Sequence, residues 1–199
     1  IPFFGKMDLT ALGVADIDRF KTVKVKSGLK PKTINNVLCV LSRCLRSAVE
    51  WEEMDRLPLI KPLKVEPPSF RFLSPHETIK LIQSCSEPMW RCMIIIAART
   101  GMRLGELFGL EWEAIDFQRR QIVVRKSIVR GHVGTPKSNK FRHIPICEEA
   151  YHALSLRRQS SGLVFCRGDG TALSQHMAER ALHRACEKAG LSVIYTPLN

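Results

Sequence analysis

Arg103 and Glu106 are the residues of this sequence whose types and spacing best suit chemistry on an anion. An apolar run ends before Gly101, and helical apolar spacing resumes with Leu107 and Phe108. This pattern predicts two helices joined by a turn at the glycine, with the arginine in the first turn of the second helix. A guanidinium beside the free N–H groups of a helix start can bind phosphate, and a carboxylate on the same face can hold it. On spacing alone, a surface ion pair is the more common meaning of such a pattern.

The composition of the chain favours a polyanionic partner. Its 199 residues hold 31 Lys and Arg against 19 Asp and Glu, a net charge of +12, which points to nucleic acid before membrane. The longest wholly apolar run, residues 93–98, is too short to span a bilayer, and no signal-like leader precedes the first predicted domain. We therefore expect a soluble protein without a membrane partner.

The cysteines and histidines give only a weak indication of metal binding. The seven cysteines are scattered and form no Cys-x-x-Cys pair, so we expect reduced thiols in a cytoplasmic protein. His183 and Cys186 share a predicted helix face, but two ligands without two more do not make a site. The sequence therefore predicts no metal centre.

Helical periodicity dominates the first part of the chain. Apolar residues recur at threes and fours between about residues 32 and 51, and a shorter helix is predicted over residues 16–26. Between Arg19 and Arg46 there are eight basic residues and no acid. Such a run is usually a solvated face, but this bias also suits contacts with DNA phosphates. The candidate DNA-binding residues here are Lys30, Lys32 and Arg43.

Prolines at positions 58, 62, 67 and 68 predict a linker or domain boundary over residues 58–70. A capping box then starts a helix at Ser74, and another helix follows from about Pro88. β-Branched residues between 122 and 146 predict a small antiparallel sheet, and two further helices are expected near 148–158 and 174–189. The fold class is therefore α+β, an all-helical N-terminal domain followed by a mainly helical domain with a small antiparallel sheet.

Basic residues also gather in the second part. Eight lie between Arg119 and Arg142 without an acid, so one sheet edge or hairpin is expected to face phosphates. On the last helix, basic residues recur every fourth position, on a face that is either DNA-facing or merely solvated. The candidate DNA-binding residues of this part are Lys140, Arg142, Arg180 and Arg184.

The string Thr-Gly-Met-Arg-Leu-Gly-Glu-Leu at residues 100–107 resembles the first active-site box of the tyrosine recombinases, or phage-type integrases. Residues 135–146 resemble the hairpin of that family that carries a catalytic lysine, here matched by Lys137, although an exposed turn lysine is the plainer interpretation. Residues 29–36 and 72–77 also resemble family segments. The resemblance covers nearly the whole chain, in the expected order.

The resemblance implies site-specific DNA recombination or integration, in which strands are cleaved and rejoined through a 3′-phosphotyrosine link. Arg103 would bind the scissile phosphate, Glu106 would support it, and Lys137 would act as general acid. Residues 1–66 would form a partial core-binding domain and residues 67–199 the catalytic domain. The family needs no metal or nucleotide cofactor, and its full-length members act on double-stranded DNA as homotetramers.

The family continues into a His-x-x-Arg box and then a nucleophilic tyrosine, and this sequence matches neither. The tyrosines Tyr151 and Tyr195 do not fit the nucleophile. We therefore expect an incomplete chain that binds duplex DNA without forming a covalent adduct. Two alternatives stay open, an inactive DNA-binding remnant of an integrase and a basic nucleic-acid-binding protein whose Arg103 box is coincidental.

Overall fold

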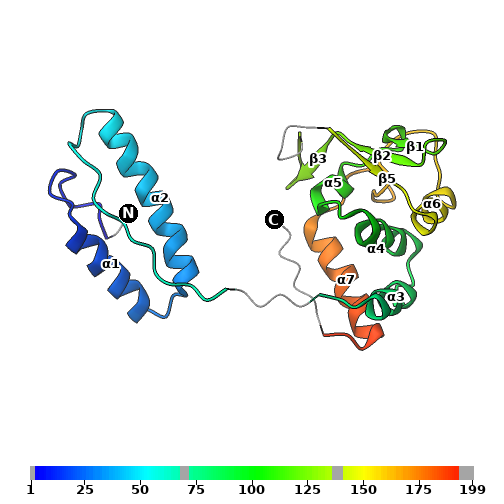
Figure 1. Cartoon of the computed structure of the whole chain (residues 1–199), viewed down its shortest axis with the longest axis horizontal. Coiled ribbons are helices and arrows are strands. Elements are labelled where there is room, and N and C mark those ends of the chain that lie inside the picture. The colour runs from blue at the N-terminus through cyan, green and yellow to red at the C-terminus, as the bar shows by residue number, and fades with distance from the viewer. Residues whose placement is uncertain (1–2, 68–71, 136–140, 193–199) are drawn as a thin grey trace. The chain divides into compact units, whose positions relative to one another are not determined.

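The computed structural model describes residues 3–67, 72–135 and 141–192. The chain forms two compact units, residues 1–70 and residues 71–199. Figure 1 shows both, with the first unit built on α1 and α2 and the second containing the remaining labelled helices and strands.

The first unit is a pair of packed helices, α1 (Val14–Lys26) and α2 (Pro31–Glu50). Pro31 opens α2, where its fixed backbone angle suits the first helical turn. Phe20 of α1 and Leu38 of α2 are almost completely buried. The other core residues are Leu12, Ile17, Ile34, Leu41, Leu45, Ala48 and Met54. Burial of one apolar face per helix therefore accounts for the two helices that the periodicity predicts.

The proline-containing segment after these helices is partly packed rather than a free linker. Residues 58–67 form no helix or strand, yet Ile60 and Leu63 pack against the core of the first unit. The Asn35 side chain donates to the Leu63 carbonyl at 2.9 Å and accepts from the Leu63 N–H at 2.8 Å. The first part of the segment predicted as a linker over residues 58–70 thus belongs to the first unit, because the Asn35 side chain bonds both backbone groups of Leu63.

The second unit is mainly helical, as predicted, and its described residues form two small antiparallel sheets where one was expected. Its helices are α3 (Pro75–Ser84), α4 (Pro88–Thr100), α5 (Leu104–Phe108), the 3-10 turn Trp112–Ala114, α6 (Glu148–Ser155) and α7 (Gln175–Ala189). Its strands are β1 (Ile115–Asp116), β2 (Gln121–Val124), β3 (Ser127–Val129), β4 (His132–Gly134) and β5 (Arg142–Pro145). The sheet orders are β1-β2-β5 and β3-β4, with all pairs antiparallel.

Local capping explains where the helices of this unit begin and end. The Ser74 N–H donates to Glu77 Oε2 at 2.8 Å and the Glu77 N–H donates to Ser74 Oγ at 3.2 Å, which is the predicted capping box of α3. α4 is followed by its C-cap Gly101, whose φ of 62° is the left-handed conformation that the turn requires. α4 therefore stops before Arg103, which is the N-cap of α5.

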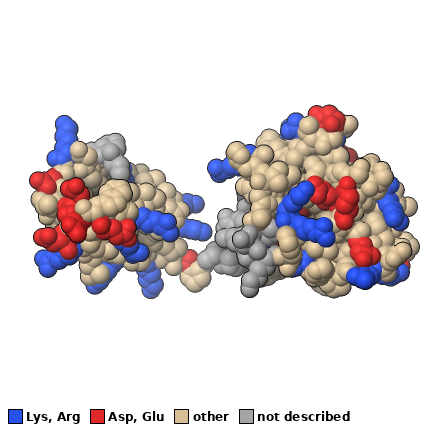
Figure 2. Space-filling model, turned by 90° about the horizontal axis from the view of Figure 1, so that it is seen from above, with Lys and Arg blue, Asp and Glu red and all other residues tan. Residues whose placement is uncertain are grey.

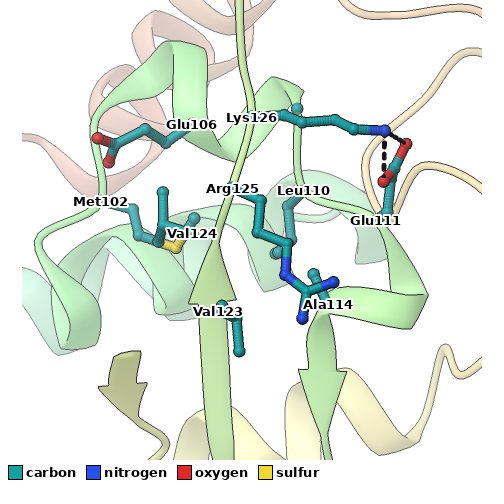
Figure 3. Close-up of a pocket in the computed structure, with 10 residues that line it drawn as sticks. Met102, Glu106, Leu110, Glu111, Ala114, Val123, Val124, Arg125 and Lys126 are labelled. Carbon is teal, nitrogen blue, oxygen red and sulfur yellow. Dashed lines mark hydrogen bonds and ion pairs between the residues drawn. The ribbon is translucent and has the colours of Figure 1, made fainter. Parts of the chain in front are cut away.

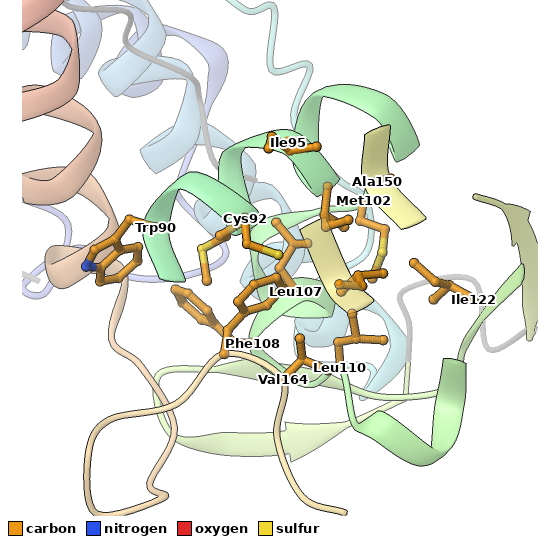
Figure 4. Close-up of a cluster of buried hydrophobic side chains, with 14 of the residues drawn as sticks. Trp90, Cys92, Ile95, Met102, Leu107, Phe108, Leu110, Ile122, Ala150 and Val164 are labelled. Carbon is orange, nitrogen blue, oxygen red and sulfur yellow. The ribbon is translucent and has the colours of Figure 1, made fainter. Parts of the chain in front are cut away.

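The core of the second unit surrounds α4, which contacts α3, α5, α6 and α7. Ile96 of α4, Ile122 of β2 and Phe165 have no exposed surface, and Figure 4 shows part of this cluster around Leu107 and Phe108. Burial raises the pKa of the Cys92 thiol to about 11, so this cysteine serves as an apolar core residue. The core thus supports α5, the short helix after Arg103.

All seven cysteines are free. Among the described residues, no helix is long and apolar enough to cross a membrane.

Candidate functional site

The site around Arg103 is built on a buried carboxylate. The Glu106 side chain is 1% exposed, whereas the Arg103 side chain is 50% exposed. Glu106 Oε1 accepts from Arg103 Nη1 at 3.1 Å, and Oε2 accepts from the Arg103 backbone N–H at 2.8 Å. Glu106 therefore caps the N-terminus of α5 and also fixes the Arg103 side chain. Because its carboxylate is buried, the pair is not a surface ion pair.

The helix that follows Arg103 is shorter than the sequence pattern suggests. α5 spans Leu104–Phe108, with Arg103 at its N-cap, and the chain turns away at Gly109. Only five residues are helical, and the Arg103 N–H is already bonded to Glu106. The Arg103 N–H is therefore not free for an anion, and the group of Arg103 that is available is its guanidinium.

Arg142 is the second cation on the same carboxylate. It lies in β5, where it pairs with Val124 of β2, and its Nη2 donates to Glu106 Oε2 at 2.7 Å. Its Nη1 donates to Glu106 Oε1 at 3.2 Å, so the contact is bidentate. The sequence marks Arg142 as a candidate DNA-binding residue within a basic run, but no local signal predicts a partner 36 residues earlier.

Other members of that basic run also have acidic partners from outside it. Lys126 binds Glu111 at 2.6 Å, and Arg120 binds Glu148 and thereby lowers the pKa of that carboxyl. Figure 2 shows blue basic and red acidic surface side by side on the second unit. A run without acids in the sequence is therefore not a continuous positive surface in the fold.

Two glycines let α5 lie directly against β3. A Cβ added at Gly105 would lie 3.1 Å from the Ile128 carbonyl oxygen, and one at Gly109 would lie 3.1 Å from the Lys126 carbonyl oxygen. Most real Cβ atoms keep a larger distance, so a side chain at either position would force the neighbouring backbone to move by a few tenths of an ångström. The backbone of β3 thus determines where α5, and with it Arg103, is placed.

We expect Gly109→Ala to destabilise the second unit by about 1–3 kcal/mol, because the added methyl group meets backbone atoms that cannot move alone. Urea unfolding followed by circular dichroism measures the change. Gly134→Ala is the matched control, because a Cβ there meets nothing within 4 Å. Equal stability of both variants and the wild type would show that α5 can shift without cost.

The cavity beside Glu106 is too small for a ligand. Its volume is about 10 Å³, room for about one water molecule, and its lining includes Met102, Val124 and the Lys126–Glu111 pair (Figure 3). Within the described ranges, no group of three or more His, Cys, Asp or Glu side chains is arranged to hold a metal ion. The exposed guanidinium of Arg103 therefore offers a surface site for an anion.

The remaining predicted site residues are distributed over both units. Arg180 is exposed on α7, whereas Arg184 of the same helix binds Glu87 at 2.9 Å. In the first unit, the exposed candidates are Lys30, Lys32 and Arg43. The predicted Lys137 and Lys140 lie outside the described residues, so the structure does not place them beside Arg103.

Tyr151 has an evident structural role. It lies in α6, with its ring centroid 5.8 Å from that of Phe117 and 4.6 Å from the Arg120 guanidinium carbon. These contacts place it in an aromatic and cationic cluster at the β1–β2 turn. The sequence likewise assigns it no catalytic part.

A family comparison extends the local match at Arg103 to most of the second unit. The profile of the "Phage integrase family" matches residues 71–198. The chain belongs to the phage integrase family. Among curated relatives, the integrase of Salmonella phage P22 is 37% identical over 84 residues, covering 42% of this chain and 21% of the relative. The ICEBs1 integrase of Bacillus subtilis is 26% identical, covering 96% of this chain and 58% of the relative.

Solved integrase structures share the fold. The Tn1549 transposon integrase in complex with a circular intermediate DNA aligns with a TM-score of 0.80 at 20% identity, covering 95% of this chain and 69% of that chain. A lambda integrase dimer bound to a core site aligns with a TM-score of 0.74 at 19% identity, covering 96% and 68%. The matched part of this chain spans about a fifth of the length of the phage P22 integrase and under three fifths of the length of the ICEBs1 integrase.

Proposed function

We propose that this chain takes part in site-specific DNA recombination, binding duplex DNA and engaging a phosphodiester through Arg103. The observation that carries the proposal is the buried Glu106 carboxylate, which holds an exposed guanidinium at the position of the family's first active-site arginine. A fixed guanidinium can donate to the non-bridging oxygens of a phosphate and stabilise the charge that develops during cleavage. The membership of the phage integrase family supports this assignment.

In this proposal, Lys137 is the general acid that protonates the departing 5′ oxygen, and Glu106 supports Arg103. A lysine close to the scissile phosphate can transfer a proton in the transition state without a metal. The family's His-x-x-Arg box and tyrosine nucleophile are matched to no residue of these 199, so the covalent 3′-phosphotyrosine step is not assigned to Tyr151 or Tyr195.

We assign residues 1–66 to DNA core binding and residues 67–199 to the catalytic domain. The outward face of α2 carries the exposed residues Lys32, Arg43 and Arg46, with Lys30 at its N-cap. Among the described residues these four form no ion pair, so their charge is available for backbone phosphates. Arg180 of α7 is a further exposed cation, and it forms no ion pair within the part of the chain that the structure describes. Duplex DNA is the proposed partner, in a cytoplasmic, DNA-associated protein.

Assembly on DNA is part of the same proposal. A lambda integrase tetramer has been solved on a Holliday junction, and it aligns with this chain at a TM-score of 0.68. By analogy we propose a homotetramer on two duplexes as the recombining state.

The proposal is tested by measuring DNA affinity at several salt concentrations. Fluorescence anisotropy with a labelled duplex should give a linear plot of log K against log salt concentration, with a slope near −0.9 for each phosphate contacted. Arg103→Ala should weaken binding by about tenfold and reduce the slope by about one, because one phosphate contact is lost.

Arg158→Ala is the control, because this guanidinium is engaged 4.4 Å above the Phe117 ring. Binding that does not depend on salt, or equal affinities for wild type and Arg103→Ala, would contradict the proposed function. If Arg158→Ala binds DNA as weakly as Arg103→Ala, the weaker binding reflects the lower net charge of the protein and not a contact made by Arg103.

A further inference from the structure

The two arginines that meet at Glu106 bind it in different ways. Arg142 places its two terminal nitrogens on the two carboxylate oxygens, at 3.2 and 2.7 Å. Arg103 uses one terminal nitrogen, at 3.1 Å, together with its backbone N–H. Among the described residues, Nε and Nη2 of Arg103 make no hydrogen bond, so this guanidinium keeps donors for a ligand.

The three side chains of this cluster also differ in how much of their surface is exposed. The Arg103 side chain is 50% exposed, that of Arg142 is 37% exposed, and that of Glu106 is 1% exposed. The carboxylate is removed from water, so its negative charge is screened only by the groups that touch it. Arg103 is the more open of the two cations.

The charges of this cluster decide whether an anion can bind. Arg103 and Glu106 alone would form a neutral pair, and a phosphate at the guanidinium would meet a carboxylate directly behind it. Arg142 adds a second positive charge, so the three side chains together carry one net positive charge. A structural ion pair thereby becomes a cationic site.

We propose that Arg142 is a positioning residue that neutralises Glu106, so that the charge of Arg103 is available to the DNA phosphate. This inference rests on the proposed function and refines the expectation that Arg142 itself contacts DNA. Because Arg142 comes from β5 and Glu106 from α5, the contact also fixes the strand against the helix that follows Arg103.

A double-mutant cycle tests this proposal, with Arg142→Gln, Glu106→Gln and the double variant. Glutamine retains the shape of Glu106 and a carbonyl oxygen for the Arg103 N–H. Arg142→Gln leaves the cluster neutral and should weaken binding of a labelled duplex by about tenfold, as Arg103→Ala does. The double variant regains one net positive charge and should bind within about twofold of the wild type.

Two results would overturn the proposal. If the double variant binds as weakly as Arg142→Gln, removal of the carboxylate does not restore the charge of Arg103, and Arg142 contacts the phosphate itself. If Arg142→Gln binds like wild type, its charge has no role. If Arg103→Ala also binds like wild type, the proposed function fails rather than the role of Arg142.

Thermal unfolding of every variant shows whether a loss of binding comes from a loss of folding. The variant Arg142→Lys is a second control. The lysine keeps the positive charge but cannot form the bidentate contact. Arg142→Lys should retain the affinity for DNA within about threefold even if its unfolding temperature falls. If Arg142→Lys loses as much affinity for DNA as Arg142→Gln, the bidentate contact with Glu106 is required and the positive charge alone is not sufficient.

Discussion

Replacing Glu106 with alanine is expected to lower the free energy of unfolding of the second unit by about 3 kcal/mol. The change leaves Arg103 and Arg142 side by side without the carboxylate that both bind, and it removes the acceptor of the Arg103 N–H. This is the lower end of the range for breaking a buried ion pair, because both guanidiniums retain contact with water. Urea unfolding followed by circular dichroism gives the value.

Glu149→Ala is the matched control for this prediction. Glu149 binds Arg99 at 2.6 Å, but its side chain is 41% exposed, so its loss should cost about 0–1 kcal/mol. Equal losses for the two glutamates would mean that the burial of Glu106 adds nothing to its contribution.

Replacing Phe20 with alanine is expected to unfold the first unit and leave the second folded. The Phe20 ring is 2% exposed and lies 5.3 Å from the Phe3 ring centroid and 5.1 Å from that of Phe4. Loss of a buried phenylalanine costs about 3–5 kcal/mol, which is most of the stability of a unit this small. The cores of the two units share no residue among those described.

Hydrogen exchange followed by mass spectrometry distinguishes the two units. Peptides from α1 and α2 should lose protection in Phe20→Ala, while peptides from α4 and α7 should keep it. Val40→Ala, at a side chain that is 61% exposed, is the control and should alter neither set. Simultaneous loss of protection in both units would show that they unfold as one.

Local signals in the sequence are sufficient to predict most of the helices of this fold. The Ser74 capping box, Gly101 and the apolar spacing of α2 each act within a few residues, so they are visible without tertiary structure. The strands β2 and β3 are predictable in the same way, since both are short β-branched runs, but their place in two separate sheets is not.

The site itself could be predicted only in part. The contact between Arg103 and Glu106 follows from their spacing, but burial of the carboxylate depends on how α5 packs. Arg142 reaches Glu106 because β5 pairs with β2, and no spacing rule relates a strand residue to a helix residue so distant in sequence. The shortness of α5 also escaped prediction, because the close approach of Gly109 to Lys126 is a tertiary contact.

The unpaired basic face of α2 has a consequence for the electric field of the protein. A cation bound to a carboxylate, as Lys126 is, produces a dipolar field that fades faster with distance than the field of a lone charge. Lys32, Arg43 and Arg46 of α2 are lone charges among the described residues, so their potential extends to about one Debye length, roughly 8 Å at physiological salt. The α2 face therefore attracts an approaching polyanion from farther away than a paired cation such as Lys126 does.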